Sequence, residues 1–145
     1  MKFLFLAGFF FVSCSSDLKY TVSDKVSEAT YNAVAGVWSS CDSNKEKTIE
    51  FSADKSFSIV SKAFESEDCS GEAKSSSEVT GKYKMKVVQE EGQQSFYKQI
   101  LLSTNSSIEK MSLEVSDEEL VLKSLEDSNS LDLLSTESSL TLKKQ

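Results

Sequence analysis

The sequence contains no histidine, no arginine and no proline. Without histidine, the chain lacks the commonest general base and the commonest metal ligand among side chains. Without arginine, it lacks the planar group that binds carboxylates and phosphates through two parallel hydrogen bonds. All 16 basic residues are therefore lysines. These absences exclude a histidine-activated nucleophile and an arginine clamp on an anionic substrate.

The length and charge of the chain limit its organisation and its partners. With 145 residues it has room for one domain. Its formal net charge is −7, whereas binding to nucleic acid requires a basic face that meets the phosphates. We therefore expect a single acidic domain and no nucleic-acid partner.

Long hydrophobic runs are scarce, and the longest one lies at the start of the chain, over Phe3–Val12. A helix needs about 20 apolar residues to span a bilayer, so this run is too short for a transmembrane helix. With Lys2 before it, the run has the form of a secretory signal peptide. The sequence predicts that residues 1–13 are a signal peptide and are removed.

The signal ends in Val12-Ser13-Cys14, and a polar run starts at Ser15. This arrangement resembles the lipobox of bacterial lipoproteins. The resemblance implies cleavage before Cys14, a diacylglycerol on its sulfur and a fatty acyl group such as palmitate on its amine. Two or three acyl chains anchor a protein stably, and Ser15 after the cysteine resembles the outer-membrane sorting pattern. The alternative is an ordinary secretory signal with an incidental cysteine.

Residues 14–34 are expected to form the lipidated cysteine, a polar tether and a short helix. Val26, then Ala29 or Thr30, and then Ala33 have helical spacing. Thr21 and Asp24 fit a capping box at the start of this helix, and Gly36 can end it. An extended linker is the alternative, because threonine and valine are poor helix formers.

Cys41 and Cys69 remain after Cys14 takes lipid. An exported chain meets an oxidising compartment, so the two are expected to form a disulfide. Two buried thiols or a metal pair are the alternatives. A zinc site lacks a third ligand of the right type, and we expect no metal and no cofactor.

From residue 35 the hydrophobic period changes to two, which is typical of strands. Val79, Tyr83 and Met85 alternate with polar residues that include a lysine stripe. The predicted strands cover residues 34–41, 48–52, 56–61, 78–88, 95–103, 108–115, 120–122, 131–133 and 140–142. Residues 108–125 also fit a helix, but the alternation of Met111 and Leu113 favours strands. The pattern predicts an all-β domain over residues 35–145, as a sandwich or a small antiparallel up-and-down barrel of about eight strands.

The start of this domain carries the motif Gly36-Val37-Trp38. The motif resembles the G-x-W signature of the lipocalin and calycin superfamily, and later pieces up to about residue 125, such as Ile49-Glu50-Phe51 and Gly81-Lys82-Tyr83, also resemble bacterial lipocalin-like domains. The resemblance implies an up-and-down barrel with Gly36 and Trp38 at one end. The family's arginine, which packs across the tryptophan, has no counterpart in a chain without arginine.

No residue pattern indicates catalysis. A serine nucleophile needs an activating base, and no spacing points to a serine–lysine pair. The acidic groups at Glu65–Asp68 and Asp117–Glu119 lie in predicted turns and lack the spacing of a calcium loop. We expect solvated turn charges and no enzymatic activity.

A barrel of eight strands can hold one small ligand or be filled by its own side chains. The apolar residues that line such a pocket in our prediction are Phe51, Phe57, Ile59, Tyr83, Met85, Phe96, Ile100 and Met111. The alternative is that they simply fill the core. The sequence thus favours a lipid-anchored, outer-membrane envelope protein with a non-catalytic role, as a lipocalin-like barrel for a small hydrophobic ligand. The alternative function is a protein-interaction module of the envelope, an inhibitor or assembly factor with a filled barrel, which acts through surfaces such as the Cys69 loop or the lysine stripe.

Overall fold

The computed structural model describes residues 20–23, 26–90, 96–125 and 139–145. The predicted signal peptide, Cys14 and the predicted strand at 131–133 lie outside these residues. The described elements are β1 (Tyr20–Ser23), α1 (Glu28–Val34), β2 (Gly36–Asp42), β3 (Lys45–Phe51), β4 (Ser56–Ala63), β5 (Ser75–Glu90), β6 (Phe96–Ser103), β7 (Ile108–Val115), β8 (Glu119–Ser124) and β9 (Ser139–Lys144).

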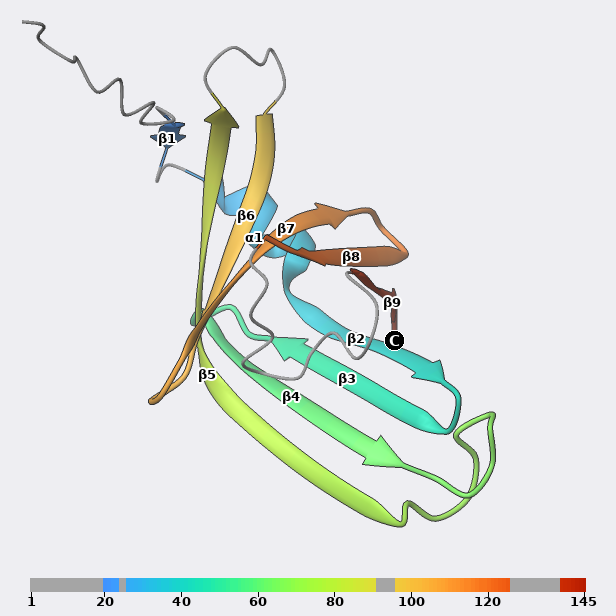
Figure 1. The fold of residues 1–145 in the computed structure, drawn as a ribbon. Helices are drawn as coiled ribbons and strands as arrows, with labels where there is room; N and C mark the ends of the chain where they lie inside the picture. The colour runs from blue at the N-terminus through green and yellow to red at the C-terminus, as the bar shows by residue number, and fades with distance from the viewer. Residues whose placement is uncertain (1–19, 24–25, 91–95, 126–138) are drawn as a thin grey trace, which may run out of the picture.

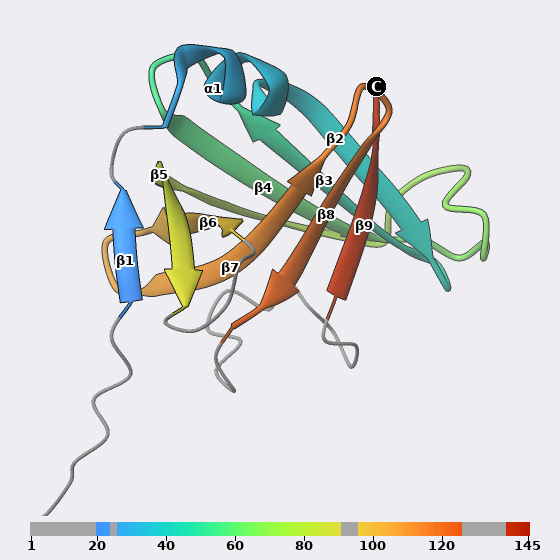
Figure 2. The same ribbon diagram turned by 90° about the horizontal axis from the view of Figure 1, so that it is seen from above.

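The strands β2 to β9 form a closed antiparallel barrel of eight strands (Figures 1 and 2). Each strand pairs with the next one in the chain, and β9 returns to pair with β2 through Trp38↔Lys144 and Ser39↔Lys143. The small up-and-down barrel predicted from the alternation is therefore confirmed. The region 108–125, for which a helix was the alternative, forms β7 and β8.

The barrel is strongly staggered. When the register is followed strand by strand around the barrel, it returns to β2 displaced by about 12 residues. The eight-stranded TIM barrel, with a shear of 8, is less staggered. Stagger and strand tilt rise together in a closed barrel. These strands are therefore strongly tilted relative to the barrel axis, and the interior has room for large side chains.

Turn chemistry explains the tight connection between β2 and β3. Asp42 pairs with Lys45, so only Ser43 and Asn44 form the loop. Their φ angles are 48° and 67°. A two-residue hairpin turn with both central residues at positive φ matches the right-handed twist of its strands. Asparagine, as at Asn44, visits this conformation more readily than most residues, because its short polar side chain is able to bond locally.

The helix was predicted, but its start was not. Ser27 caps α1, and its side-chain oxygen accepts a hydrogen bond from the Thr30 N–H at 3.3 Å. The predicted capping residue Thr21 instead lies in β1, which pairs with Val87–Glu90 of β5. Tyr, Thr and Val favour pleated backbone, so this short segment extends the sheet where the prediction had a tether and a capping box.

Helix α1 covers one end of the barrel. On this side of β5, the pairing with β4 ends at Lys82 and the pairing with β1 begins at Val87, so the residues between them have no strand neighbour there. In this gap the Met85 N–H donates to the Tyr31 hydroxyl at 3.1 Å, and the Tyr83 N–H donates to the Lys55 carbonyl at 2.8 Å. Val34 is fully buried against the core. The helix therefore supplies the hydrogen bond and the apolar contact that a strand would otherwise give.

The predicted disulfide is present. Cys41 and Cys69 are bonded with an S–S distance of 2.04 Å. The bond ties the end of β2 to the long loop between β4 and β5. Phe64 of this loop also donates its N–H to the carbonyl of Asn44 in the β2–β3 turn, at 2.8 Å. The bridge thus restrains the loop at the end of the barrel that α1 does not cover.

Replacing both Cys41 and Cys69 with serine should lower the free energy of unfolding by about 3 kcal/mol, because the bridge removes entropy from the unfolded chain. Urea denaturation followed by circular dichroism measures this loss. The single variant Cys41→Ser should leave one thiol that reacts with a thiol reagent in the native protein. A Cys69 that already reacts in the unsubstituted protein would contradict the bridge.

Candidate functional site

Seven of the eight predicted pocket-lining residues lie in one packed core. They are Phe51, Phe57, Ile59, Tyr83, Met85, Ile100 and Met111, and none is more than 3% exposed. Phe51 and Tyr83 meet edge to face, with ring centroids 5.0 Å apart. These side chains belong to one buried cluster that also contains Trp38 and several leucines. Phe96 behaves differently, because it is 63% exposed.

Phe96 lies at an opening in the barrel wall. The pairing of β6 with β7 ends at Lys98↔Leu113, although β6 begins at Phe96 and β7 continues to Val115. Beyond this pair, β6 stays with β5 and β7 stays with β8. Figure 1 shows β5 and β6 rising together while β7 and β8 turn away. Two-stranded ribbons twist more than wide sheets, which accounts for the separation.

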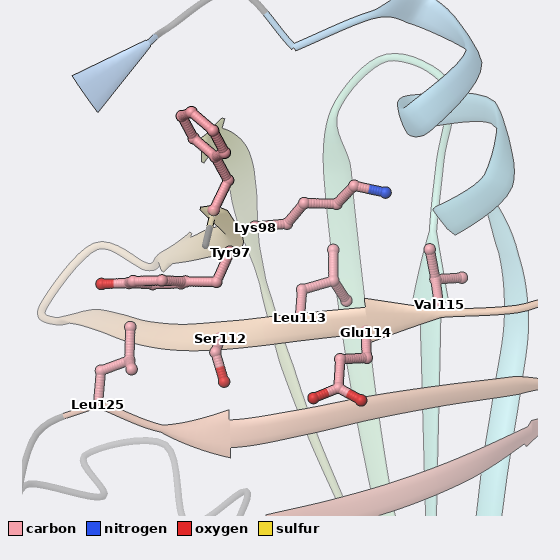
Figure 3. Close-up of a pocket in the computed structure, with 8 residues that line it drawn as sticks. Tyr97, Lys98, Ser112, Leu113, Glu114, Val115 and Leu125 are labelled. Carbon is pink, nitrogen blue, oxygen red and sulfur yellow. The ribbon is translucent and has the colours of Figure 1, made fainter. Parts of the chain in front are cut away.

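We call this opening the β6–β7 slot. It has a volume of about 690 Å³, which lies within the range of small-molecule sites. Figure 3 shows Leu113 and Val115 on one side of β7 and Ser112 and Glu114 on the other. The slot therefore has contributions from both the inner and the outer face of the wall. Its lining residues are Phe96, Tyr97, Lys98, Ser112, Leu113, Glu114, Val115 and Leu125.

The slot combines apolar contact surface with one cation. Leu113 is buried in the core cluster and Val115 packs against it, whereas Leu125 is 41% exposed. On the outer face, Glu114 is already paired with Lys123 at 2.8 Å. Lys98 lies on the same side of β6 as the buried Ile100, and no carboxylate among the described residues forms an ion pair with it. An apolar molecule with an anionic or polar head suits this lining.

The predicted barrel-end residues Gly36 and Trp38 lie under the last residues of β9. Trp38 is fully buried, and its Nε1–H donates to the Val34 carbonyl at 2.8 Å. Lys144 extends across it, with Nζ 5.3 Å from the ring centroid. A side chain at Gly36 would have its Cβ 3.6 Å from the Lys144 Cε. A lysine thus makes the cation–π contact for which the sequence offers no arginine.

A second hollow, of about 260 Å³, lies towards the other end of the barrel. There the inner face of β3, β4 and β5 changes from apolar to polar. Two of its lining residues, Lys62 and Glu46, form an ion pair at 3.7 Å. The lining residues are Lys45, Glu46, Lys47, Ser61, Lys62, Ala63, Ser75, Ser76 and Ser77. It is smaller than the slot, and Ala63 is the one apolar residue type in its lining, so the slot is the stronger candidate site.

The shifted carboxylates belong to turns. Hydrogen bonds from Ser56 and Lys82 lower the pKa of Asp54 to about 2. Hydrogen bonds from Ser70 and Ser66 lower the pKa of Asp68. Burial raises the pKa of Tyr83, whose hydroxyl donates to the Ser52 carbonyl at 3.1 Å. Each shift has a local structural cause, and none of these groups lines the slot.

Within the described part of the chain, no group of three or more His, Cys, Asp or Glu side chains is arranged to hold a metal ion. The helix in that part, α1, is not long and apolar enough to cross a membrane. One charged side chain described by the structure is buried: Glu109, at 2% exposure, on the inner side of β7 towards the end far from the slot.

The sequence reasoning identified only Phe96 among the slot residues. Alternation shows which side of a strand a residue faces, and it placed Leu113 and Val115 correctly on the inner side of β7. It does not show where two paired strands separate. Because β6 and β7 are each eight residues long, their lengths do not indicate that the pairing stops short. No signal in the sequence marks Lys98 and Leu113 as the last pair.

Comparison of the chain with known protein families, with curated proteins and with solved structures finds no match.

Proposed function

We propose that this chain is a lipid-anchored protein of the bacterial cell envelope that binds a small hydrophobic molecule at the β6–β7 slot without transforming it. The anchor is Cys14 and the membrane is the outer membrane. The barrel is a lipocalin-like scaffold, and the chain uses no cofactor. The observation that carries the binding role is the slot itself, an open hollow of about 690 Å³ whose lining includes the core residue Leu113.

Three features support this proposal. The lipobox-like Val12-Ser13-Cys14 and the short apolar run before it support the anchor. The contact of Lys144 with Trp38 supports the lipocalin-like scaffold, because a cation lies where the resemblance requires one. The apolar rim and Lys98 support a ligand with a hydrophobic body and a polar or anionic head, since directed polar groups in an apolar site give orientation.

The second candidate is a protein-interaction module of the envelope. The packing of seven predicted pocket residues in one core favours it, because a filled interior leaves only surfaces for recognition. In that case the slot is a groove for a protein segment, and the barrel is a rigid support. The two candidates differ in what copurifies with the protein, a small molecule or a polypeptide.

Native mass spectrometry of the full chain purified from its host, before and after exchange into a panel of lipids, tests the proposal. We expect a bound small molecule in the purified protein, and saturable binding of an added anionic fluorescent amphiphile. Phe96→Ala should weaken that affinity about tenfold, because removing a phenyl ring from the contact costs roughly 1.5 kcal/mol. Ile108→Ala is the matched control, since Ile108 is 59% exposed on β7 and lies outside the slot.

Equal affinities for the Phe96→Ala and Ile108→Ala variants would place the ligand elsewhere. If no species is bound and no member of the panel binds, the ligand-binding role is wrong. A polypeptide captured from envelope extract, and lost on Phe96→Ala, would then support the interaction module.

A further inference from the structure

The first described strand brings the start of the domain beside the slot. In the backbone register, Thr21 of β1 is opposite Gln89 of β5, and Gln89 is opposite Phe96 of β6. Neighbouring strands are about 4.8 Å apart, so the backbone at Thr21 lies about 10 Å from that at Phe96. In Figures 1 and 2, β1 lies beside the C-terminal half of β5, away from the β2–β3 hairpin.

The chain between the proposed anchor and this strand is short. Cys14 precedes Tyr20 by six residues. A fully extended chain spans at most about 3.5 Å per residue, so Tyr20 lies within about 21 Å of the anchored cysteine. The end of the barrel that carries the slot is therefore held close to the lipid surface.

This end of the barrel also exposes apolar side chains. The described residues include three exposed large hydrophobic side chains, namely Phe96 at 63%, Ile108 at 59% and Leu125 at 41%. Phe96 and Leu125 both line the slot, whereas Ile108 lies at the other end of the β6–β7 pair. Exposed apolar groups gathered at one site indicate a contact surface.

We infer that the barrel docks on the membrane with the β6–β7 slot facing the lipid, and that Phe96 enters the interfacial layer. This inference rests on the proposed anchor at Cys14. The short tether supplies the lipid surface at this end, and the exposed phenylalanine and leucine supply the contact. The same geometry gives the slot a ligand source, because an amphiphile dissolved in the bilayer reaches Lys98 without passing through water.

Bromolipid quenching tests the orientation. The full-length Phe96→Trp variant, purified from host membranes, is reconstituted into phosphatidylcholine vesicles with brominated acyl chains, which quench indole fluorescence on contact. We expect the added indole to lose at least half of its emission relative to vesicles of unbrominated lipid. The unsubstituted protein gives the background from the buried Trp38, and intact-mass measurement reports the acyl groups.

Ile108→Trp is the matched control. Ile108 is opposite Ser103, seven residues along β6 from Phe96, which is about 23 Å at the rise of a strand. We expect its added emission to be unchanged by bromine. Acylated protein with no quenching at either site, or equal quenching at both, overturns the docking and leaves the anchor intact. Protein without the acyl mass overturns both the anchor and the docking. Quenching that a bound polypeptide relieves identifies the slot as a groove for protein, and it overturns the docking on lipid.

Discussion

Replacing Trp38 with alanine should lower the free energy of unfolding by about 4 kcal/mol or more, enough to unfold much of the protein at ambient temperature. The indole is fully buried among the core side chains, and its loss leaves a large cavity. It also leaves the Val34 carbonyl, which accepts the Nε1–H at 2.8 Å, without this donor. Urea denaturation followed by far-ultraviolet circular dichroism measures the loss, since the variant has no other tryptophan.

Two variants separate the contributions of packing and hydrogen bonding. Trp38→Phe keeps most of the apolar volume and removes the donor, so it should cost about 1–3 kcal/mol. Phe96→Ala removes an exposed aromatic ring and should cost less than about 1 kcal/mol. If Trp38→Ala costs no more than Phe96→Ala, then Trp38 does not hold α1 to the barrel end.

Replacing Gly81 with alanine should lower the free energy of unfolding by about 3 kcal/mol, because the added methyl group meets a backbone atom that no rotamer change can move. A Cβ at this position would lie 2.2 Å from the Ser103 carbonyl oxygen and 2.7 Å from the Phe57 Cε1. In a domain of this size, such a loss lowers the melting temperature by roughly 10 °C. A thermal melt followed by circular dichroism measures it.

The neighbouring Thr80 provides the control. It lies on the same strand, faces solvent and pairs with Ser58. Thr80→Ala should change the free energy of unfolding by less than about 1 kcal/mol, which is the range of strand propensity. Equal melting temperatures for the Gly81→Ala and Thr80→Ala variants would show that β5 has space at Gly81 and would contradict the close approach of β6.

Periodicity predicted most of the barrel because every strand has a buried and a solvated side. The alternation at Val79, Tyr83 and Met85 fixed the inner side of β5, and the cysteine count indicated the Cys41–Cys69 bond. The short helix was also foreseen, but its start at Ser27 was not. The pairing of β1 with β5 decides that boundary, and pairing between segments more than 60 residues apart leaves no local mark.

The site was harder to predict than the fold. Apolar inward-facing residues have the same pattern whether they fill a barrel or line a cavity, so Phe57 and Ile100 were natural candidates for a pocket. The slot depends instead on where β6 and β7 separate and on a lysine, Lys98, at that point. Both depend on the twist of the whole sheet, which is a property of the assembled barrel.

The pairing of β9 with β2 sets the order of events during synthesis. Closure joins Trp38 to Lys144 and Ser39 to Lys143, and Gln145, the last residue of the sequence, donates its N–H to the Val37 carbonyl at 3.0 Å. Contacts between residues so far apart make folding slow. Until β9 is made, the outer edge of β2 stays unpaired and open to other strands. A chaperone that shields this edge would therefore act at the step where a growing chain is most prone to aggregate.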